Sequence, residues 1–317
     1  GRRGLLIATM ATDTGKTVAE SDPEVSEAID FARYYARAAL ATGRITGAIA
    51  RPLGPVVVVP PWNFPLAIPA GGMLAALAAG NTVILKPAPE SRETARQLVE
   101  LCWSAGIDRD VLQFLPTDDD DAGRALVTHV DVGAVILTGS YGTARMFHDW
   151  SPGLRLHSET SGKNAIVVTA HADVDRAVLD LVRSAFGNAG QKCSAASVAI
   201  VVAALYDDAR FLERLRDAAA TLHVGQPDDL ATDVGPLIGP PGDDLRRALT
   251  TLDPGERWLL QPECRSDDER LWSPAGWAWR HEAGLVAPEF WRPEGQGSWS
   301  LLRFGRRLDV ADLLDEP

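Results

Sequence analysis

Between Pro55 and Leu137, short apolar runs alternate with amphipathic segments. A short continuous apolar run is typical of a strand buried on both faces, and the segments between such strands supply the helices that cover them. The alternation therefore predicts an α/β fold with a parallel sheet. On such a sheet, ligands bind beyond the carboxyl ends of the strands. We expect strands at 55–59, 81–85, 111–115 and 133–137, and helices at 67–79, 93–104 and 123–129.

The pattern continues beyond residue 160. An apolar run at 164–169 predicts another strand, and helical periodicity over 172–186 precedes a β-branched run at 197–202. A charged helix is expected at 207–222. Five of the nine tryptophans lie between Trp272 and Trp299, and regular periodicity is lost after about residue 253. We therefore expect irregular structure in that last part.

The first residues contain a motif that imitates a phosphate-binding loop. The stretch ending in Gly15-Lys16-Thr17 has Met10 at the position where such a loop requires glycine. A helix with a surface turn is therefore expected instead. A second helix is expected over 24–41, with Pro23 near its start.

Composition excludes several classes of protein. The formal net charge of −12 argues against a general nucleic-acid surface and against an anionic membrane partner. Three widely spaced cysteines fit neither a disulfide framework nor a metal site, so we expect a reducing, cytoplasmic environment and no metal. The sequence has neither an 18-residue apolar run nor a signal peptide.

Cys193 lies where the helix expected over 172–186 gives way to the strand at 197–202. Gly187 and Gly190 open the backbone around it, so a substrate could approach closely. A lone cysteine is more often a small buried hydrophobe. The polar neighbours Gln191, Lys192 and Ser194 favour an accessible thiol.

Asn63, Lys86, Glu159 and Cys193 all stand at expected strand ends or glycine turns. Together they suggest covalent catalysis, with the thiolate as nucleophile and the amide of Asn63 holding an oxyanion. Glu159, in a glycine-containing turn, could activate water, and Lys86 could hold a ribose or a phosphate. Each also has a structural alternative, as a turn residue, a strand terminus or a loop carboxylate. The scattered histidines do not identify a partner for a thiol hydrolase.

Five motifs follow one another along the chain, namely Trp62-Asn63-Phe64-Pro65, Lys86-Pro87-Ala88, Thr138-Gly139-Ser140, Glu159-Thr160-Ser161-Gly162 and Gly190-Gln191-Lys192-Cys193-Ser194. Their order and spacing resemble those of the aldehyde dehydrogenase superfamily. Residues 27–36 and Cys193-Ser194-Ala195 point to one branch of it. The chain is most similar to that branch, the pyrroline-5-carboxylate dehydrogenases, including the C-terminal module of bifunctional proline-oxidising proteins.

The resemblance implies a Rossmann-like NAD-binding domain over 1–160 and a second α/β catalytic domain over 161–317. Cys193 would attack the aldehyde, Asn63 would hold the oxyanion and Glu159 would activate water. The residues implied for NAD are Trp62, Lys86, Gly139, Ser140 and Glu289, and those for the substrate are Glu27, Phe64 and Ser194.

The implied reaction is the NAD-dependent oxidation of L-glutamate γ-semialdehyde to glutamate in proline catabolism, through a thiohemiacetal and a thioester. The alternatives are an inactive fragment or dinucleotide-binding remnant of such an enzyme, or an enzyme for another aldehyde. The resemblance also implies that longer relatives form homo-oligomers or are fused to a proline dehydrogenase domain, and that this chain is truncated at both ends.

The chain departs from the family pattern at four positions. Pro89 stands where an acidic residue is common, and Ala144 replaces a glycine expected late in a turn. The best match to a C-terminal nicotinamide-ribose motif is Glu289-Phe290-Trp291-Arg292-Pro293, in which tryptophan and arginine replace phenylalanine and glycine.

Overall fold

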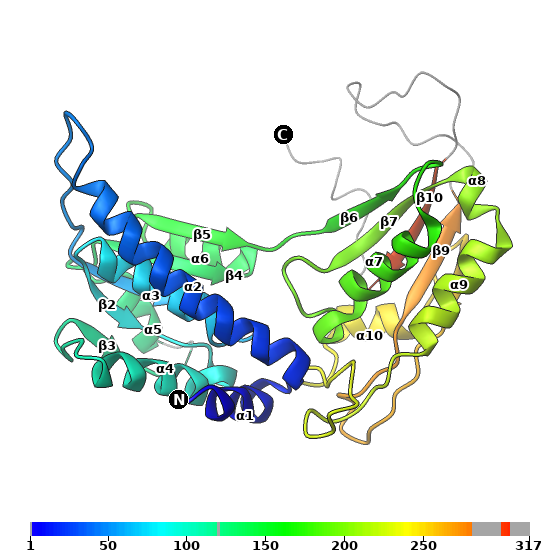
Figure 1. Ribbon diagram of the computed structural model, residues 1–317, viewed down its shortest axis with the longest axis horizontal. Coiled ribbons are helices and arrows are strands. Elements are labelled where there is room, and N and C mark those ends of the chain that lie inside the picture. Colours follow the sequence, from blue (N-terminus) through cyan, green and yellow to red (C-terminus); the bar gives the residue numbers. More distant parts are fainter. Residues whose placement is uncertain (1, 119–120, 281–298, 305–317) are drawn as a thin grey trace. The chain divides into compact units, whose positions relative to one another are not determined.

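The computed structural model describes residues 2–118, 121–280 and 299–304. The chain divides into two compact units, Gly1–Ser161 and Gly162–Pro317 (Figure 1). Each unit has its own sheet and its own hydrophobic core.

The first unit is built on a parallel sheet with the strand order β3-β2-β1-β4-β5. The central strand β1 (Pro55–Val59) pairs with β2 (Thr82–Leu85) on one side and β4 (Ala134–Gly139) on the other. β3 (Leu112–Phe114) and β5 (Leu156–Thr160) form its edges. Because the strand order reverses between β1 and β4, their carboxyl ends form the topological switch point of the sheet.

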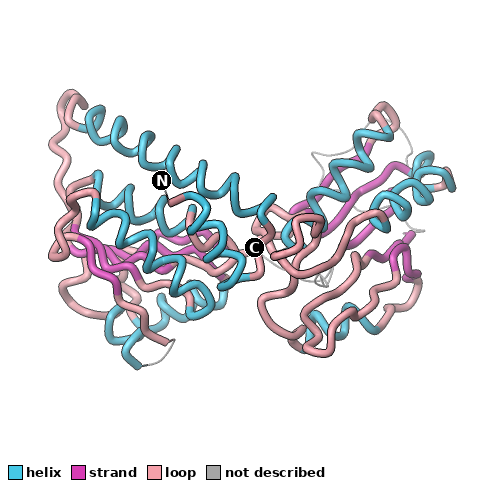
Figure 2. Tube along the Cα trace, turned by 60° about the horizontal axis from the view of Figure 1, so that its bottom comes forward, coloured by secondary structure: helices cyan, strands magenta, loops and turns pink. Residues whose placement is uncertain are grey.

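Both faces of β1 are buried, which explains its unbroken run of valines. Val56 and Val58 pack in a core with α1 to α4, whereas Val57 and Val59 pack in another core with α5 and α6. Figure 2 shows helices on either side of these strands. The helices are α1 (Arg3–Thr14), α2 (Val18–Thr42), α3 (Ala67–Ala78), α4 (Arg92–Ser104), α5 (Asp121–Val127) and α6 (Tyr141–Trp150), with a 3-10 turn, η1 (Pro89–Ser91), before α4.

The second unit contains a mixed sheet with the strand order β6-β7-β10-β9-β8. β6 (Asn164–Val168) and β7 (Ala196–Val202) are parallel. β10 (Trp299–Phe304) runs antiparallel to β7 and to β9 (Gly276–Arg280), which in turn pairs with β8 (Glu256–Leu260).

Two helices cover one core of this second sheet. Buried residues of α7 (Val174–Phe186) and α9 (Ala209–Ala220) pack together with residues of β6, β7, β8 and β9. α10 (Asp243–Thr250) forms a separate apolar cluster that includes Trp258 of β8. Two short elements follow α7 and β7, namely η2 (Gly187–Gly190) and α8 (Ala203–Tyr206).

The predicted parallel sheet is confirmed, and the elements expected over 55–137 lie within two residues of their predicted ends. The start of the second helix differs, because α2 begins at Val18 and contains Pro23. Residues after 253, where irregular structure was expected, include the strands β8, β9 and β10. Ala144, where the resemblance placed a glycine turn, is a buried residue inside α6.

Candidate active site

Cys193 lies in an exposed turn between η2 and β7. Before it, Asn188, Ala189 and Gly190 all have positive φ angles, of 53°, 55° and 71°. Left-handed conformations are unfavourable for residues other than glycine, so this stretch is strained at Ala189. Gly187 instead has φ −56°, which any residue can adopt, so only Gly190 meets the expectation of a backbone that needs glycine.

Hydrogen bonds hold the backbone of this turn. The side-chain amide of Asn164, at the start of β6, donates to the carbonyl oxygens of Cys193 at 2.5 Å and Ala195 at 3.2 Å. On the other side, Gln191 Nε2 donates to Pro236 O at 3.3 Å, and its Oε1 accepts from the amide of Ile238 at 2.9 Å. The turn therefore presents an accessible thiol on a fixed backbone. Ser194, the predicted substrate contact, is also exposed beside it.

Asn63 lies in the loop from β1 to α3, at the switch point of the first sheet. Trp62 and Phe64 beside it are partly buried. The carbonyl oxygen of Asn63 accepts a hydrogen bond from Lys16 Nζ at 3.0 Å. Placement at the end of a central strand agrees with the position that the sequence predicted for a ligand-binding loop.

Three of the residues expected to hold a dinucleotide, Lys86, Gly139 and Ser140, lie at the ends of the two strands that flank β1. Lys86 directly follows β2 and is 3% exposed. A Cβ placed on Gly123 of α5 would lie 3.4 Å from Lys86 Cε, so the lysine side chain runs along α5. Gly139 ends β4, and Ser140 caps α6 by accepting a hydrogen bond from the amide of Thr143 at 3.0 Å.

Glu159 does not lie in the turn that the sequence predicted. It belongs to the edge strand β5, where it pairs with Thr138 of β4, and its side chain is exposed. The chain turns two residues later, at Ser161, which has φ 47° and accepts a hydrogen bond from the amide of Tyr141 at 3.0 Å. The carboxylate therefore stands at the carboxyl edge of the first sheet.

Glu27 lies on a partly exposed face of α2. Partial burial first, and then the charge of Glu24, raise the pKa of Glu27 above its usual range. It lines a hollow of about 760 Å³ together with Phe31, Tyr34 and Tyr35. Glu289, the predicted ribose contact, lies outside the described residues.

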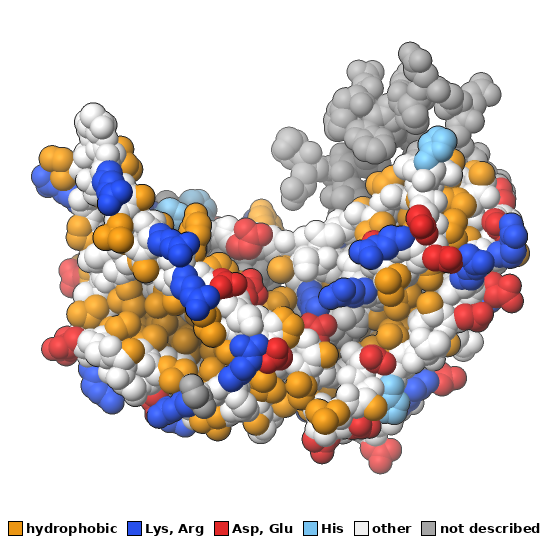
Figure 3. Space-filling view, in the orientation of Figure 1, with side chains coloured by type: hydrophobic (Ala, Val, Ile, Leu, Met, Phe, Trp, Pro, Cys, Tyr) orange, Lys and Arg blue, Asp and Glu red, His pale blue; other side chains and the backbone are white. Residues whose placement is uncertain are grey.

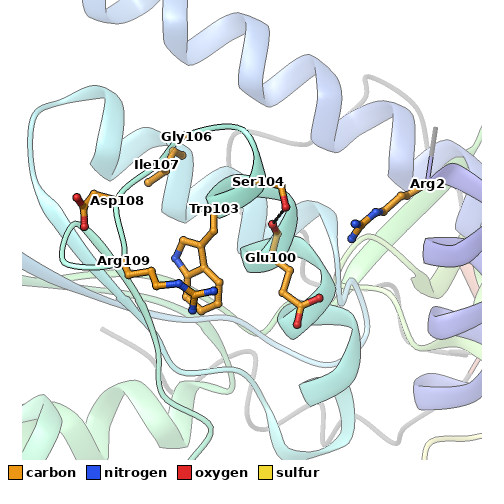
Figure 4. Close-up of a pocket in the computed structure, with 8 residues that line it drawn as sticks. All are labelled: Arg2, Glu100, Trp103, Ser104, Gly106, Ile107, Asp108 and Arg109. Atoms are coloured by element: carbon orange, nitrogen blue, oxygen red, sulfur yellow. Dashed lines mark hydrogen bonds between the residues drawn. The ribbon is translucent and has the colours of Figure 1, made fainter.

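A second hollow of the first unit, of about 700 Å³, contains none of the predicted residues (Figure 4). It lies around the loop from α4 to β3, at the amino ends of the strands. The guanidinium of Arg109 stacks over the ring of Trp103 at 3.8 Å, and Trp103 Nε1 donates to Leu112 O at 2.9 Å. Ligands of parallel sheets bind at the opposite edge, so this hollow is separate from the candidate site.

The sequence profile of the aldehyde dehydrogenase family matches residues 1–247. The chain belongs to this family. The match confirms the resemblance that five motifs indicated, and it agrees with the parallel sheet of the first unit.

Two curated relatives illustrate the branch. The chain is 37% identical over 280 residues to the bifunctional protein PutA of Salmonella typhimurium, covering 84% of this chain and 21% of the relative. It is 39% identical over 249 residues to the 1-pyrroline-5-carboxylate dehydrogenase of Geobacillus kaustophilus, covering 73% of this chain and 48% of the relative. The chain therefore spans between about a fifth and a half of these two aldehyde dehydrogenase relatives.

Solved structures of the aldehyde dehydrogenase family agree with the fold. Proline utilization A from Corynebacterium freiburgense superposes with a TM-score of 0.84 at 53% identity, over 86% of this chain and 28% of that one. A point mutant of the 1-pyrroline-5-carboxylate dehydrogenase from Thermus thermophilus gives 0.78 at 33% identity, over 86% of this chain and 56% of that one. These matches confirm the predicted aldehyde dehydrogenase-like fold class.

Three further observations concern surface charge, metal-binding groups and membrane-spanning helices. On the face that Figure 3 shows, acidic and basic side chains are interspersed over both units, without a broad basic patch among the described residues. Within those residues, no group of His, Cys, Asp and Glu side chains is arranged to hold a metal ion. None of the helices that the structure describes has the length and apolarity needed to span a membrane.

Sequence reasoning missed four residues that hold the candidate loops, namely Lys16, Glu24, Asn164 and Gln191. The only signal at Lys16 is the motif that imitates a phosphate loop. Asn164 begins a predicted strand, and nothing in its immediate sequence marks it as a partner of the thiol turn. Gln191 is a polar neighbour of Cys193 in the sequence, a signal that indicates a contact near the thiol.

Proposed function

We propose that this chain carries the thiol nucleophile and the cofactor-binding sheet of an NAD-dependent dehydrogenase that oxidises L-glutamate γ-semialdehyde to glutamate. The observation that carries the proposal is the exposed thiol of Cys193 on a backbone fixed by Asn164 and Gln191, in a chain of the aldehyde dehydrogenase family. The names of the relatives support the substrate, because 1-pyrroline-5-carboxylate is the cyclic form of this semialdehyde.

The proposed chemistry begins when the Cys193 thiolate forms a C–S bond with the aldehyde carbon and the carbonyl oxygen becomes an oxyanion. The side-chain amide of Asn63 donates a hydrogen bond to that oxyanion. A nicotinamide dinucleotide, when bound, supplies the acceptor for the hydride that the carbon loses. Glu159 then takes a proton from water, whose oxygen attacks the thioester carbon. The C–S bond breaks, Cys193 leaves as thiolate and the product is a carboxylate.

The first unit offers residues that fit a dinucleotide. Gly139, Ser140 and the amino end of α6 lie at the switch point of the sheet, where the backbone dipoles favour a pyrophosphate. Lys86, at the end of the neighbouring strand β2, would contact the adenosine ribose. Trp62 and Glu289 remain predicted cofactor contacts.

The amino-acid end of the substrate carries an ammonium group and a carboxylate, joined to the aldehyde by methylene groups. Each of these three needs a matching side chain on the protein. We propose that Glu27 faces its ammonium group, because this carboxylate stands among aromatic side chains in a hollow on α2. Ser194, exposed next to the thiol, would donate a hydrogen bond to its carboxylate, and Phe64 would pack against its methylene groups.

NADH formation from pyrroline-5-carboxylate and NAD tests the proposal directly. We expect Cys193→Ala to abolish NADH formation, whereas Cys264→Ala, which removes another exposed thiol of the same unit, leaves it unchanged. Activity that survives Cys193→Ala excludes this nucleophile. If the unaltered chain binds NAD in a titration but forms no NADH, the non-catalytic dinucleotide-binding alternative holds instead.

A further inference from the structure

Lys16 and Glu24 form a buried ion pair in the first unit. Their side chains are each 1% exposed, and Lys16 Nζ lies 2.5 Å from Glu24 Oε2. Removing two charges from water is costly, and the cost is recovered only when additional hydrogen bonds satisfy both groups. The other hydrogen bonds of Lys16 and Glu24 therefore indicate which part of the fold this pair stabilises.

Those contacts lead to the loop that carries Asn63. Lys16 Nζ donates to the carbonyl oxygen of Asn63 at 3.0 Å and lies 4.2 Å from the ring centroid of Phe64. Glu24 Oε1 accepts the amides of Leu66 at 2.8 Å and Ala67 at 3.0 Å. The pair thus holds the loop at Asn63 and again where α3 begins.

The local fold brings both charges to this place. Gly15 ends α1 with φ 72°, a left-handed conformation that suits glycine, and the chain reverses so that Lys16 points inward. Glu24 lies in the second turn of α2 and acts on the amino end of α3, where a carboxylate is favoured by the helix dipole. The motif that imitates a phosphate loop is therefore a connection between two helices, and its turn is buried, not at the surface as expected.

We infer that Lys16 and Glu24 are positioning residues, which fix the backbone of Asn63 and thereby aim its side-chain amide at the oxyanion. The inference rests on the proposed function. Stabilisation of an oxyanion depends on donors that are already in place, and a displacement of about 1 Å can reduce the rate about a hundredfold.

The double variant Lys16→Met with Glu24→Gln tests this inference. It removes both charges without leaving one unpaired, and the glutamine oxygen can still accept the amides of Leu66 and Ala67. We expect the midpoint of thermal unfolding to stay within a few degrees of the unaltered chain. We expect kcat for NADH formation to fall about tenfold to a hundredfold, with the Kd for NAD changed less than about twofold.

A control variant removes a more exposed ion pair nearby, which joins α1 to α2. Arg3 Nε lies 2.5 Å from Asp22 Oδ1, and the other hydrogen bonds of the Arg3 guanidinium lead to Asp22 O and Ser26 Oγ, away from the Asn63 loop. The double variant Arg3→Met with Asp22→Asn is expected to retain kcat. Hydrogen exchange of a peptide spanning residues 62–67 supplies a second readout, which should rise in the Lys16 variant and not in the control.

Three results separate the possible failures. If the unaltered chain is active and the Lys16 double variant keeps its kcat, the positioning role is wrong while the proposed function stands. If kcat falls equally in both double variants, the effect is general loosening of α1 and α2, and the inference is again wrong. If the unaltered chain forms no NADH, the proposed function fails and this inference fails with it.

Discussion

In the first unit, the carbonyl oxygen of Asn63 accepts a hydrogen bond from the buried ammonium of Lys16. In the second unit, the carbonyl oxygen of Cys193 accepts a hydrogen bond from the exposed side-chain amide of Asn164. Both loops are thus held through the backbone carbonyl of the residue proposed to act. The difference lies in the cost of breaking the contact. A buried charge pair is expensive to break, while an exposed amide contact is worth little.

The largest expected effect comes from breaking the buried pair on one side only. Lys16→Met leaves the carboxylate of Glu24 buried without its cation, so we expect the free energy of unfolding to fall by about 3–5 kcal/mol. Chemical denaturation measures this loss. The double variant with Glu24→Gln should recover most of it. A single variant as stable as the unaltered chain would contradict the buried pair.

The thiols of the two units should differ in reactivity by a large factor. Burial raises the pKa of the Cys102 thiol in α4 to about 11, so its thiolate fraction near neutral pH is about a hundredfold below that of an ordinary thiol. Cys193 is exposed. Timed alkylation followed by mass spectrometry should label Cys193 and leave Cys102 unmodified in the native chain. Equal labelling of both would show that α4 opens readily.

Breaking the contact in the second unit should cost much less. Asn164→Ala removes the hydrogen bonds to the carbonyls of Cys193 and Ala195, and we expect it to lower the free energy of unfolding by about 1 kcal/mol. The alkylation rate of Cys193 should change, whereas that of Cys264 should not. A loss as large as that of Lys16→Met would remove the contrast between the two loops.

The smallest expected effect has the opposite sign. Ala189→Gly relieves a left-handed alanine, so it should raise the free energy of unfolding by up to about 1 kcal/mol. Ala177→Gly, in the regular helix α7, should instead lower it by about 1 kcal/mol. Urea denaturation of both variants checks the pair. A destabilising Ala189→Gly would mean that the strain in η2 is not stored at this residue.

Much of the fold could be predicted because its signals are local. The valines of β1 predict a strand, and the small apolar residues of α3 predict a helix, each from a pattern only a few residues long. The edge strand β5 could not be recognised, since it is polar and largely exposed and is defined by its pairing with β4. β8 and β9 have no regular alternation and depend on antiparallel partners that are distant in the chain. For α2, the packing of Val25 in the core and the hydrogen bonds of Glu24 outweigh the usual effect of Pro23.

The candidate site divides in the same way. Asn63, Lys86 and Ser140 follow strands, so the alternation alone placed them at one edge of a sheet. The contacts that hold the loops could not be predicted, because each joins residues that no short-range pattern connects. Lys16 reaches Asn63, and Asn164 reaches Cys193, only after the helices and strands between them have packed.

The valines of β1, whose side chains point in turn to the two faces of the sheet, also have a consequence for biosynthesis. Val56 pairs with Val83 on one side and with Ala134 on the other, so the strand is complete only when β4 has been made. A shift of one residue in this pairing would exchange the side chains destined for the two helical layers. On the ribosome, the apolar strand β1 therefore lacks its second partner until Gly139, the last residue of β4, has left the exit tunnel. Chaperone binding before that point should protect the nascent chain from aggregation.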